Sequence, residues 1–448
     1  MASSFFLLLM LLVVAPLALL LFLRLIARPR LTKVPIKGRH VLISGGSSGI
    51  GLAMAELAAM EGASCVSILA RDPRKLEDAK CQIQLSTGLP DDRVRVLIAD
   101  VRDFEGVKRV VEEASAGGPP VDVLVCNQGV FVPQELESQE MDTAKYMVDI
   151  NLIGTLHLIK AVLPQMKHRD DPSTPASIAL MSSQAGQVGI YGYVAYSASK
   201  FGLRGLGEAL QQEVIVDNIR VSLIFPPETQ TPGLLEENKT KPEITKIIAA
   251  SSYAMEAKEV ARKALDGIKA GRFIVTCNFE GFMLSIATAG VSPQTSYGMA
   301  FIEVVAAGFI RVVGLCFLWN WFGIAERWHA ERKKVLLYCM RNEFAYYPLG
   351  KTIHHQIFSH YFYPCSFGHS LCSSRAFHLN QVAPLNRCCT KFALHIVSPP
   401  KSTFLYLCHL LKLHISSLVY IHFEFYLFLS CHAAISISST QPHSSYGI

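Results

Sequence analysis

The sequence predicts an α/β fold in which a doubly wound parallel sheet of about seven strands is covered by helices on both faces. Two observations carry this prediction. From residue 40 onward, short runs of β-branched and apolar residues alternate with amphipathic stretches of helical periodicity. The first of these runs ends in a glycine-rich turn, which is typical of the first strand of such a sheet.

The strands and helices follow from this alternation in chain order. The expected strands are 40–44, 65–70, 94–99, 121–126, 177–181, 221–225 and 273–277. The expected helices are 50–61, 73–85, 104–115, 142–168, 195–216 and 257–270. Together they predict one domain over residues 36–280.

An apolar run with no charged residue precedes this domain at residues 5–23. As a helix, at about 1.5 Å per residue, it would nearly cross the hydrocarbon core of a bilayer. A cleaved signal peptide is the alternative, but the run is longer than an ordinary signal core and no basic residue precedes it. Basic residues follow it instead, at Arg24, Arg28, Arg30, Lys33 and Lys37. We therefore expect a transmembrane anchor at 1–27 with the domain on the cytosolic side.

The C-terminal part of the chain departs from the alternating pattern. Residues 281–334 are apolar, but Glu303 and Arg311 interrupt the segment 299–325, which favours an interfacial, re-entrant or packed helix over a simple span. We expect 281–334 to be associated with the membrane, or to be an amphipathic helix pair that closes a substrate pocket. Residues 335–448 hold eleven of the fifteen histidines and seven of the twelve cysteines, without the paired spacing of a zinc site. We expect no metal there, and interpret 335–448 as a poorly structured tail unrelated to the domain's chemistry.

The charge of the chain gives no sign of a nucleic-acid partner. The formal net charge is +6, and residues 335–448 account for +5 of it. The remaining residues carry +1, so the domain has no overall basic excess for a phosphate backbone.

A glycine-rich turn follows the first expected strand and leads into a helix. It reads Ser44-Gly-Gly-Ser-Ser-Gly-Ile-Gly51. Small residues let backbone amides and a helix N-terminus approach a pyrophosphate, so this turn predicts a Rossmann dinucleotide site. Its candidate cofactor contacts are Gly45, Ser47, Ser48, Gly49, Ile50 and Gly51.

The end of the second strand indicates which dinucleotide binds. An acid at this point favours NADH, whereas a cation favours the 2′-phosphate of NADPH. Arg71 stands there, with Lys75 a further basic candidate, and we expect NADPH. Asp72 keeps NADH open, because it would reach the ribose hydroxyl if the strand ended one residue later.

Further candidates lie at the carboxyl ends of other strands, where ligands bind in open α/β sheets. Asp100 and Val101 close the third strand, and the Asp100 carboxylate is suited to accept from an adenine amino group. Helix capping is the alternative for Asp100. Asn127 and Gly129 follow the fourth strand, and Pro226 follows the sixth.

Four polar residues complete a candidate catalytic set. Asn151 lies in a long expected helix, Ser183 follows the fifth strand, and Tyr196-Ser-Ala-Ser-Lys200 places a phenol and an amine on one helix face. In this order and spacing, over roughly residues 38–280, the chain resembles the short-chain dehydrogenase/reductase family.

The resemblance implies a reduction with NADPH in which Tyr196 donates a proton to the ketone oxygen. Lys200 would lower the pKa of Tyr196 and hold the cofactor ribose, and both residues would contact the cofactor. Ser183 would orient the substrate oxygen, and Asn151 would support a water that links Lys200 to solvent.

Four stretches narrow the resemblance to members of the family that reduce a long-chain keto-sphingoid substrate at the endoplasmic reticulum membrane, with the active site toward the cytosol. They are 45–51, 182–186, 195–213 and 226–233. The substrate lid would be 229–253, where Glu236 and Glu237 are candidates for the substrate ammonium, or are simply solvated. A membrane-anchored steroid or retinoid dehydrogenase and a non-catalytic NADPH-binding scaffold are the alternatives. The sequence leaves open a homo-oligomer, which relatives of this family commonly form.

Overall fold

The computed structural model describes residues 10–26, 32–116, 118–169, 171–249 and 253–346. All of them belong to one compact unit, Met1–Pro348. The prediction for the tail therefore lies almost entirely outside the described residues.

A seven-stranded parallel sheet with the order β3-β2-β1-β4-β5-β6-β9 forms the centre of this unit. Its strands are β1 (His40–Ser44), β2 (Cys65–Ala70), β3 (Val94–Ile98), β4 (Val123–Cys126), β5 (Ala176–Met181), β6 (Ile219–Phe225) and β9 (Ile274–Thr276). The predicted sheet is confirmed, with strand ends that differ by at most two residues. The order reverses between β1 and β4, which are hydrogen-bonded neighbours. In a doubly wound sheet, ligands bind beyond the carboxyl ends of the strands at such a switch point.

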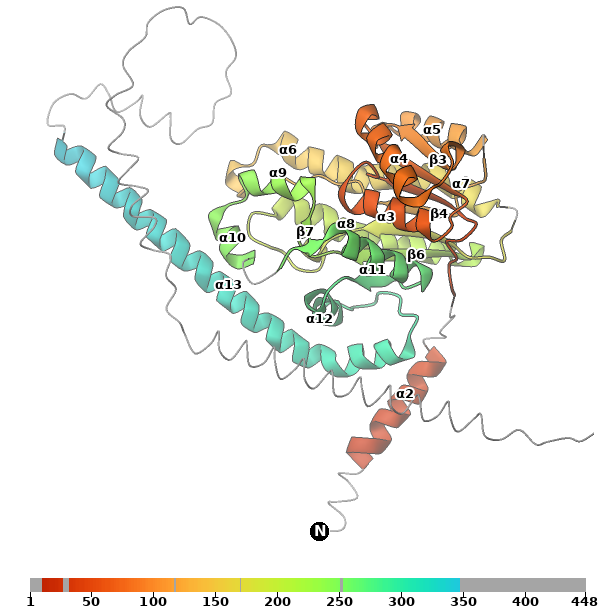
Figure 1. The fold of residues 1–448 in the computed structure, drawn as a ribbon. Helices are drawn as coiled ribbons and strands as arrows, with labels where there is room; N and C mark the ends of the chain where they lie inside the picture. The colour runs from red at the N-terminus through yellow and green to blue at the C-terminus, as the bar shows by residue number, and fades with distance from the viewer. Residues whose placement is uncertain (1–9, 27–31, 117, 170, 250–252, 347–448) are drawn as a thin grey trace, which may run out of the picture. The chain divides into compact units, whose positions relative to one another are not determined.

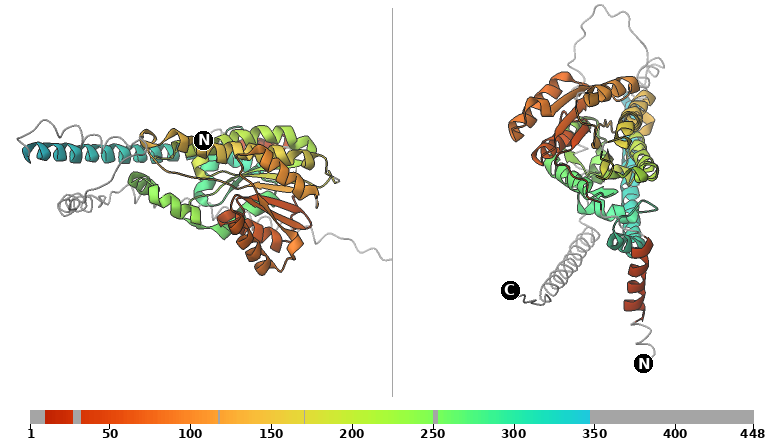
Figure 2. Two further views of the ribbon diagram at one scale, coloured as in Figure 1. Left: turned by 90° about the horizontal axis from the view of Figure 1, so that it is seen from above. Right: turned by 90° about the vertical axis from the view of Figure 1, so that its right-hand side faces the viewer.

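Helices cover both faces of the sheet (Figures 1 and 2). On one face α3 (Gly49–Met60), α4 (Pro73–Thr87) and α11 (Ala257–Lys269) enclose an apolar core that includes Ile43 and Ile68. On the other face α5 (Phe104–Ala116), α7 (Gly154–Lys167) and α8 (Val194–Val214) enclose a second core with Leu124 and Phe225. Alternate side chains of each buried strand point into opposite cores, which explains why the strands are apolar throughout.

One predicted helix is divided in the structure. The expected helix 142–168 consists of α6 (Met141–Val148), a π-helical turn η4 (Asp149–Ile153) and α7. Asn151 lies within this turn and is buried. A π-helical turn adds a residue to one turn of a helix and is frequent at functional sites, and apolar periodicity over such a length gives no sign of it.

The segment 229–253, which we expect to be the substrate lid, contains regular structure. It forms β7 (Thr229–Gln230), α9 (Pro232–Thr240) and α10 (Glu243–Ala249), and β7 pairs with β8 (Met255–Glu256). Thr231 caps α9 by accepting a hydrogen bond from the Leu234 amide at 3.2 Å, and Pro232 occupies the first turn. The role of this segment as a substrate lid stays a prediction.

Within the described residues, two long apolar helical stretches have the length and composition of a membrane span, Met141–Lys167 and Tyr297–Val335. The first is 44% buried and forms part of the sheet's helical cover, whereas the second is only 6% buried. The second belongs to α13 (Tyr297–Tyr346), one unbroken helix that follows α12 (Phe279–Ala287). Helix α13 continues to Tyr346, so the prediction that a poorly structured tail begins at residue 335 was wrong for residues 335–346. Near the N-terminus, the turn η1 (Met10–Val14) and α2 (Ala15–Ile26) occupy the predicted anchor.

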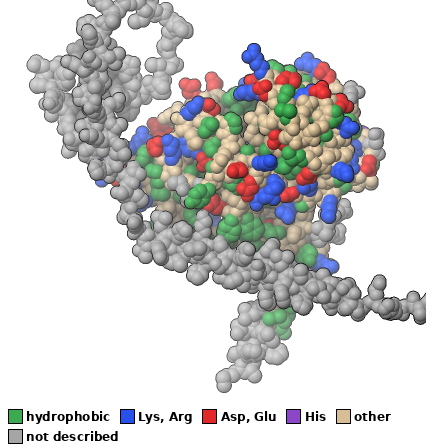
Figure 3. Space-filling model, in the orientation of Figure 1, with side chains coloured by type: hydrophobic (Ala, Val, Ile, Leu, Met, Phe, Trp, Pro, Cys, Tyr) green, Lys and Arg blue, Asp and Glu red, His purple; other side chains and the backbone are tan. Residues whose placement is uncertain are grey.

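The remaining short helical turns connect these elements. They are η2 (Asp91–Arg93), η3 (Leu136–Ser138), η5 (Gln184–Gly186) and η6 (Ile215–Asp217). Acidic and basic side chains are interspersed over the face of the domain shown in Figure 3, and hydrophobic side chains gather near α12.

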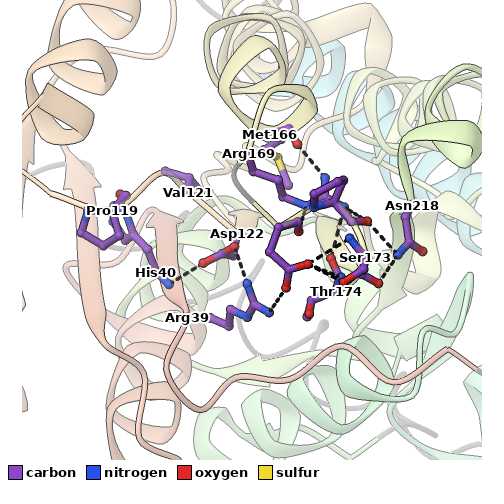
Figure 4. A network of polar contacts seen from close by, with 12 residues as sticks. Arg39, His40, Pro119, Val121, Asp122, Met166, Arg169, Ser173, Thr174 and Asn218 are labelled. Atoms are coloured by element: carbon purple, nitrogen blue, oxygen red, sulfur yellow. Dashed lines mark hydrogen bonds and ion pairs between the residues drawn. The ribbon is translucent and has the colours of Figure 1, made fainter.

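A polar network closes the edge of the sheet where β1 and β4 begin (Figure 4). Arg39 forms an ion pair with Asp122 at 3.1 Å, and Asp122 also accepts from the His40 amide at 3.1 Å. The guanidinium of Arg169 donates to five backbone carbonyls, those of Met166, Asp171, Pro172, Thr174 and Asp217. This edge is therefore bound together by hydrogen bonds, and the opposite edge holds the predicted site.

Candidate active site

The glycine-rich turn connects β1 to α3 with its backbone closely packed. Gly45 and Gly49 have φ of +63° and +57°, a region that L side chains rarely adopt. A Cβ atom at Gly51 would lie 2.2 Å from the Gly45 carbonyl oxygen, so only glycine fits there. The Asn127 amide donates to that same oxygen at 3.2 Å and fixes the turn to β4.

The N-terminus of α3 is suited to an anion. Ser48 is its N-cap residue, and the Ser48 side chain accepts no capping hydrogen bond from the helix. The first amides of α3 therefore remain available to a phosphate, which the helix dipole also favours. Because Gly45, Gly49 and Gly51 have no Cβ, the backbone of this turn is open to a dinucleotide pyrophosphate.

Arg71 directly follows β2, as expected. Its guanidinium donates to the Tyr146 hydroxyl at 3.1 Å and is otherwise at the surface. Asp72 has a different task, since its carboxylate caps α4 by accepting from the amides of Arg74 and Lys75 at 3.0 and 3.3 Å. A carboxylate used as a helix cap is poorly placed to take a ribose hydroxyl, so the arrangement favours NADPH over NADH.

Asp100 lies at the end of β3 but is already paired. Its two carboxylate oxygens accept from the Arg102 guanidinium at 2.6–3.1 Å, and this hydrogen-bonded partner lowers the pKa of Asp100. The predicted contact with an adenine amino group would have to share these oxygens. Arg102 also lies over the Tyr146 ring, 5.2 Å from its centroid, so two arginines converge on Tyr146. The place of Arg102 in the sequence gave no reason to predict it as a residue of the cofactor site.

Three further candidates follow the carboxyl ends of β3, β4 and β6. Val101 is buried, and its carbonyl contacts the His157 ring at 2.8 Å. A Cβ atom on Gly129 would lie 3.6 Å from the Lys200 ammonium nitrogen, which places this backbone beside the catalytic set. The Pro226 carbonyl accepts from the Gln184 amide at 3.0 Å and so fixes the turn after Ser183.

Tyr196 and Lys200 lie on the same face of α8, as the spacing predicts. The Lys200 ammonium is 5.6 Å from the centroid of the Tyr196 ring. It donates to the Met181 carbonyl at 2.8 Å, at the end of β5. Lys200 is 4% exposed, and burial lowers its pKa from 10.5 to about 8.

The Tyr196 phenol is held in its protonated form. Burial raises its pKa above the usual range, a hydrogen bond with Ser183 lowers it in part, and the Glu237 charge raises it further. In this structure the Lys200 ammonium donates to the Met181 carbonyl, and its expected lowering of the Tyr196 pKa stays a prediction. A protonated phenol is the form that a proton donor requires.

Ser183 and Asn151 are brought to this pair by different elements. Ser183 caps η5, where its hydroxyl accepts from the Ala185 amide at 3.2 Å. The Asn151 side chain exchanges hydrogen bonds with the backbone of Val130 at 2.9 and 3.0 Å and donates to Ser199 at 3.0 Å. Asn151 thus positions the chain after β4 against α8. Its predicted support of a water remains a prediction.

Aromatic residues that we did not predict surround Tyr196. The Phe131 ring lies 4.1 Å from the Tyr196 centroid and 4.4 Å from that of Tyr193. Tyr193 donates to Glu237 on α9 at 3.2 Å, and Lys241 forms an ion pair with Glu237 at 2.9 Å. These residues come from turns and from the supposed loop, where the sequence shows no periodic pattern to mark them.

The site therefore combines three groups. The protonated phenol of Tyr196 and the buried amine of Lys200 lie about one turn apart on α8, and the Ser183 hydroxyl is hydrogen-bonded to the phenol. A carbonyl oxygen that accepts from both Tyr196 and Ser183 would be polarised and then protonated. This chemistry is the reduction of a ketone or aldehyde, provided that a dinucleotide bound at the glycine-rich turn brings its hydride to the carbonyl carbon.

Comparison with known proteins agrees with this geometry. Residues 39–242 match the family model described as short chain dehydrogenase. Two 3-dehydrosphinganine reductases of Arabidopsis thaliana are 57% and 54% identical to the chain, over 69% and 71% of its length and 92% and 93% of theirs. A 3-dehydrosphinganine reductase of Danio rerio is 38% identical over 68% of the chain and 92% of its own length. The chain belongs to the short chain dehydrogenase family.

Proposed function

We propose that this chain is an NADPH-dependent reductase that converts 3-dehydrosphinganine (3-ketosphinganine) to sphinganine in sphingolipid biosynthesis. One combined observation carries the proposal. The chain has Ser183, Tyr196 and Lys200 together at one site, and it is 57% and 54% identical to 3-dehydrosphinganine reductases over nearly their whole length.

The residues of the chain divide the work of reduction. NADPH, when bound, supplies the hydride. The Ser183 hydroxyl donates a hydrogen bond to the C3 carbonyl oxygen and orients it beside Tyr196. Tyr196 then gives its proton to the developing alkoxide, which is a stronger base than a phenolate, so a raised phenol pKa still permits the transfer. Lys200 lies on the same face of α8 as Tyr196 and would return a proton to it.

The cofactor would be held at three points. The α3 amides and the glycine turn suit the pyrophosphate, Arg71 suits the 2′-phosphate, and Lys200 is expected to donate to the ribose hydroxyls. The Asp72 cap supports NADPH over NADH, because it removes the nearest acid from the ribose.

We also propose that the chain is attached to the endoplasmic reticulum membrane with its active site in the cytosol. The apolar run at 5–23 and the exposed apolar surface of α13 support attachment. On α13 this surface includes Val305, Phe309, Val312 and Trp319, which recur at helical spacing and are 56–71% exposed.

Contacts at two places along α13 support a helix that lies along the membrane surface. Near its start, the Glu303 carboxylate accepts from Gln294 in the segment after α12, at 2.7 Å. Nearly thirty residues later, Arg332 pairs with Glu135 at 3.3 Å and His329 contacts the Tyr191 hydroxyl at 2.9 Å. Gln294 follows the catalytic domain closely along the chain, and Glu135 and Tyr191 belong to that domain, so the proposed place of the helix between these contacts is on one side of the bilayer.

Protease protection in intact microsomes tests this arrangement. Cleavage after Arg327 and Arg332 from the cytosolic side, without detergent, is the expected result. Protection of these sites until detergent is added would mean that α13 crosses the membrane. The Asn238-Lys-Thr240 sequon should stay unglycosylated in the same sample, since it lies in the cytosol.

We also make three proposals about the domain limits, the residues beyond Tyr346 and the assembly of the chain. The domain limits 36–280 and the membrane region from 281 are retained, with the latter extended along α13 to Tyr346. The residues beyond are a passenger, so a chain that ends at Tyr346 should match the full chain in activity. A homo-oligomer through the helices at 142–168 and 195–216 is the expected assembly, which the mass of the detergent-solubilised protein would test.

The decisive experiment for the function is a reductase assay with purified protein. NADPH oxidation should follow the addition of 3-ketosphinganine, and keto-steroids and retinal should give little turnover. Preferred turnover of a steroid or of retinal would replace the substrate, and no turnover with intact NADPH binding would leave a cofactor-binding scaffold.

A further inference from the structure

We propose that Glu237 is the specificity-determining residue of this site and that it binds the protonated amine next to the ketone of the substrate. This inference rests on the proposed function, because only an amino ketone carries such a group. It selects one of two adjacent acids on α9.

The position of Glu237 places its carboxylate beside the proton donor. It accepts from the Tyr193 hydroxyl at 3.2 Å, and the Tyr193 ring meets the Tyr196 ring edge-on with centroids 6.1 Å apart. Phe131 packs against both rings. The charge of Glu237 also acts on the reacting group, since it helps to raise the pKa of Tyr196.

The charges around Glu237 do not balance. Lys241 pairs with Glu237 and with Glu228, each at 2.9 Å, so two carboxylates share one ammonium. The Lys241 side chain is 3% exposed and those of Glu237 and Glu228 are 16% and 25% exposed. An excess negative charge that is shielded from water is costly unless a cation joins it. In keeping with this, burial raises the pKa of Glu237.

An amino ketone supplies the missing cation at the required place. Its ammonium is on the carbon next to the carbonyl, so a carbonyl oxygen held by Tyr196 and Ser183 brings the ammonium into the surroundings of Tyr196. Pairing with Glu237 would neutralise the carboxylate that opposes ionisation of Tyr196. The amine would thereby assist its own reduction, and an uncharged ketone would not.

Glu236 provides a matched control on the same helix. Its side chain is 72% exposed and pairs with Lys239 at 2.7 Å on the outer face of α9. The substitution E236Q removes the same charge from the same helix without touching Tyr193 or Lys241.

The experiment compares 3-ketosphinganine with the same hydroxyketone lacking its amine, using wild type, E237Q and E236Q. The expected result for E237Q is a loss of about 10- to 100-fold in kcat/KM for the amino ketone, as for a lost charged hydrogen bond, with no loss for the ketone without amine. E236Q should leave both values unchanged. An equal loss for both ketones in E237Q would overturn the inference while leaving the proposed function intact.

Failure of the proposed function has a different signature, since wild type would then reduce neither ketone. If E237Q gives no cooperative melting transition, Y193F carries the test, because it removes only the hydroxyl that holds the carboxylate. Y193F should reduce the preference for the amino ketone in the same direction and by a smaller factor. An unchanged preference in a folded Y193F protein would count against the inference.

Discussion

At the scale of single residues, the catalytic set divides into groups that react and groups that position. Ser183, Tyr196 and Lys200 were identified from spacing alone, because a fixed helical separation places Tyr196 and Lys200 on one face. Their environment was not predictable. Phe131 and Tyr193 reach the site from irregular segments, and the Lys200 hydrogen bond to Met181 depends on how α8 packs on β5.

The substitution Y196F tests the proton donor. Removing the hydroxyl leaves the ring against Phe131, so the fold and NADPH affinity should be kept while kcat falls by about 10²- to 10⁴-fold. Steady-state kinetics and titration of NADPH fluorescence measure the two quantities. Turnover close to wild type would mean that the proton comes from another group.

The substitution K200M tests the cost of a buried amine. The lowering of the Lys200 pKa from 10.5 to about 8 means that the folded state disfavours the charged form by about 3 kcal/mol. Its hydrogen bond to Met181 returns about 1–2 kcal/mol. K200M should therefore abolish reduction and raise the free energy of unfolding at pH 7 by about 1–2 kcal/mol.

The pH dependence of stability gives the control for K200M. In wild type the unfolded state binds the Lys200 proton more tightly, so the free energy of unfolding should rise as pH increases from about 8 toward 10.5. This rise should be absent from K200M in urea titrations across that range. The same slope in both proteins would show that Lys200 does not carry the penalty.

At the scale of elements, the sheet was predictable and its connections were less so. Buried parallel strands are continuous apolar runs with sharp ends, and all seven were found to within two residues. The helices α9 and α10 are short and polar on their outer sides, so they read as a loop. The π-helical turn at Asn151 follows from tertiary contacts with Val130 and Ser199, which no local pattern records.

The end of β2 leads to a prediction about the cofactor. R71A should weaken NADPH binding by about 10- to 100-fold, because a guanidinium and a phosphate form strong charge-assisted hydrogen bonds. NADH binding should hardly change, since NADH lacks the 2′-phosphate. R74A is the control, being an exposed arginine in the first turn of α4. Equal losses for both cofactors in R71A would assign the 2′-phosphate to another residue, with Arg102 the nearest candidate.

At the scale of the whole molecule, the two edges of the sheet have different tasks. The edge at the carboxyl ends carries glycine turns and catalytic groups, and the opposite edge carries the network around Arg169 and Asp122 (Figure 4). His40 belongs to this second edge, where it is fully buried and contacts Ser67 and the Pro119 carbonyl, each at 2.8 Å. Stability is thereby concentrated away from the chemistry.

This arrangement predicts acid sensitivity that originates far from the active site. Burial lowers the pKa of His40 below 6.5, so the folded state favours the neutral ring and the unfolded state binds the proton more tightly. The contribution of His40 to stability is thus present above pH 6.5 and is lost as pH falls below it. Wild type should lose unfolding free energy between pH 7 and pH 5, with at most about 2 kcal/mol of the loss due to this one group, and H40Q should lose less. Equal losses would exclude His40 as the source.

The long exposed helix α13 changes what concentration means for this protein. If α13 lies in the membrane interface as proposed, the enzyme and a long-chain ketone share a two-dimensional phase, in which they meet by lateral diffusion. The rate should then follow the mole fraction of ketone among the lipids, and adding inert lipid at constant total ketone should slow it. For such an enzyme the membrane is the solvent of the reaction.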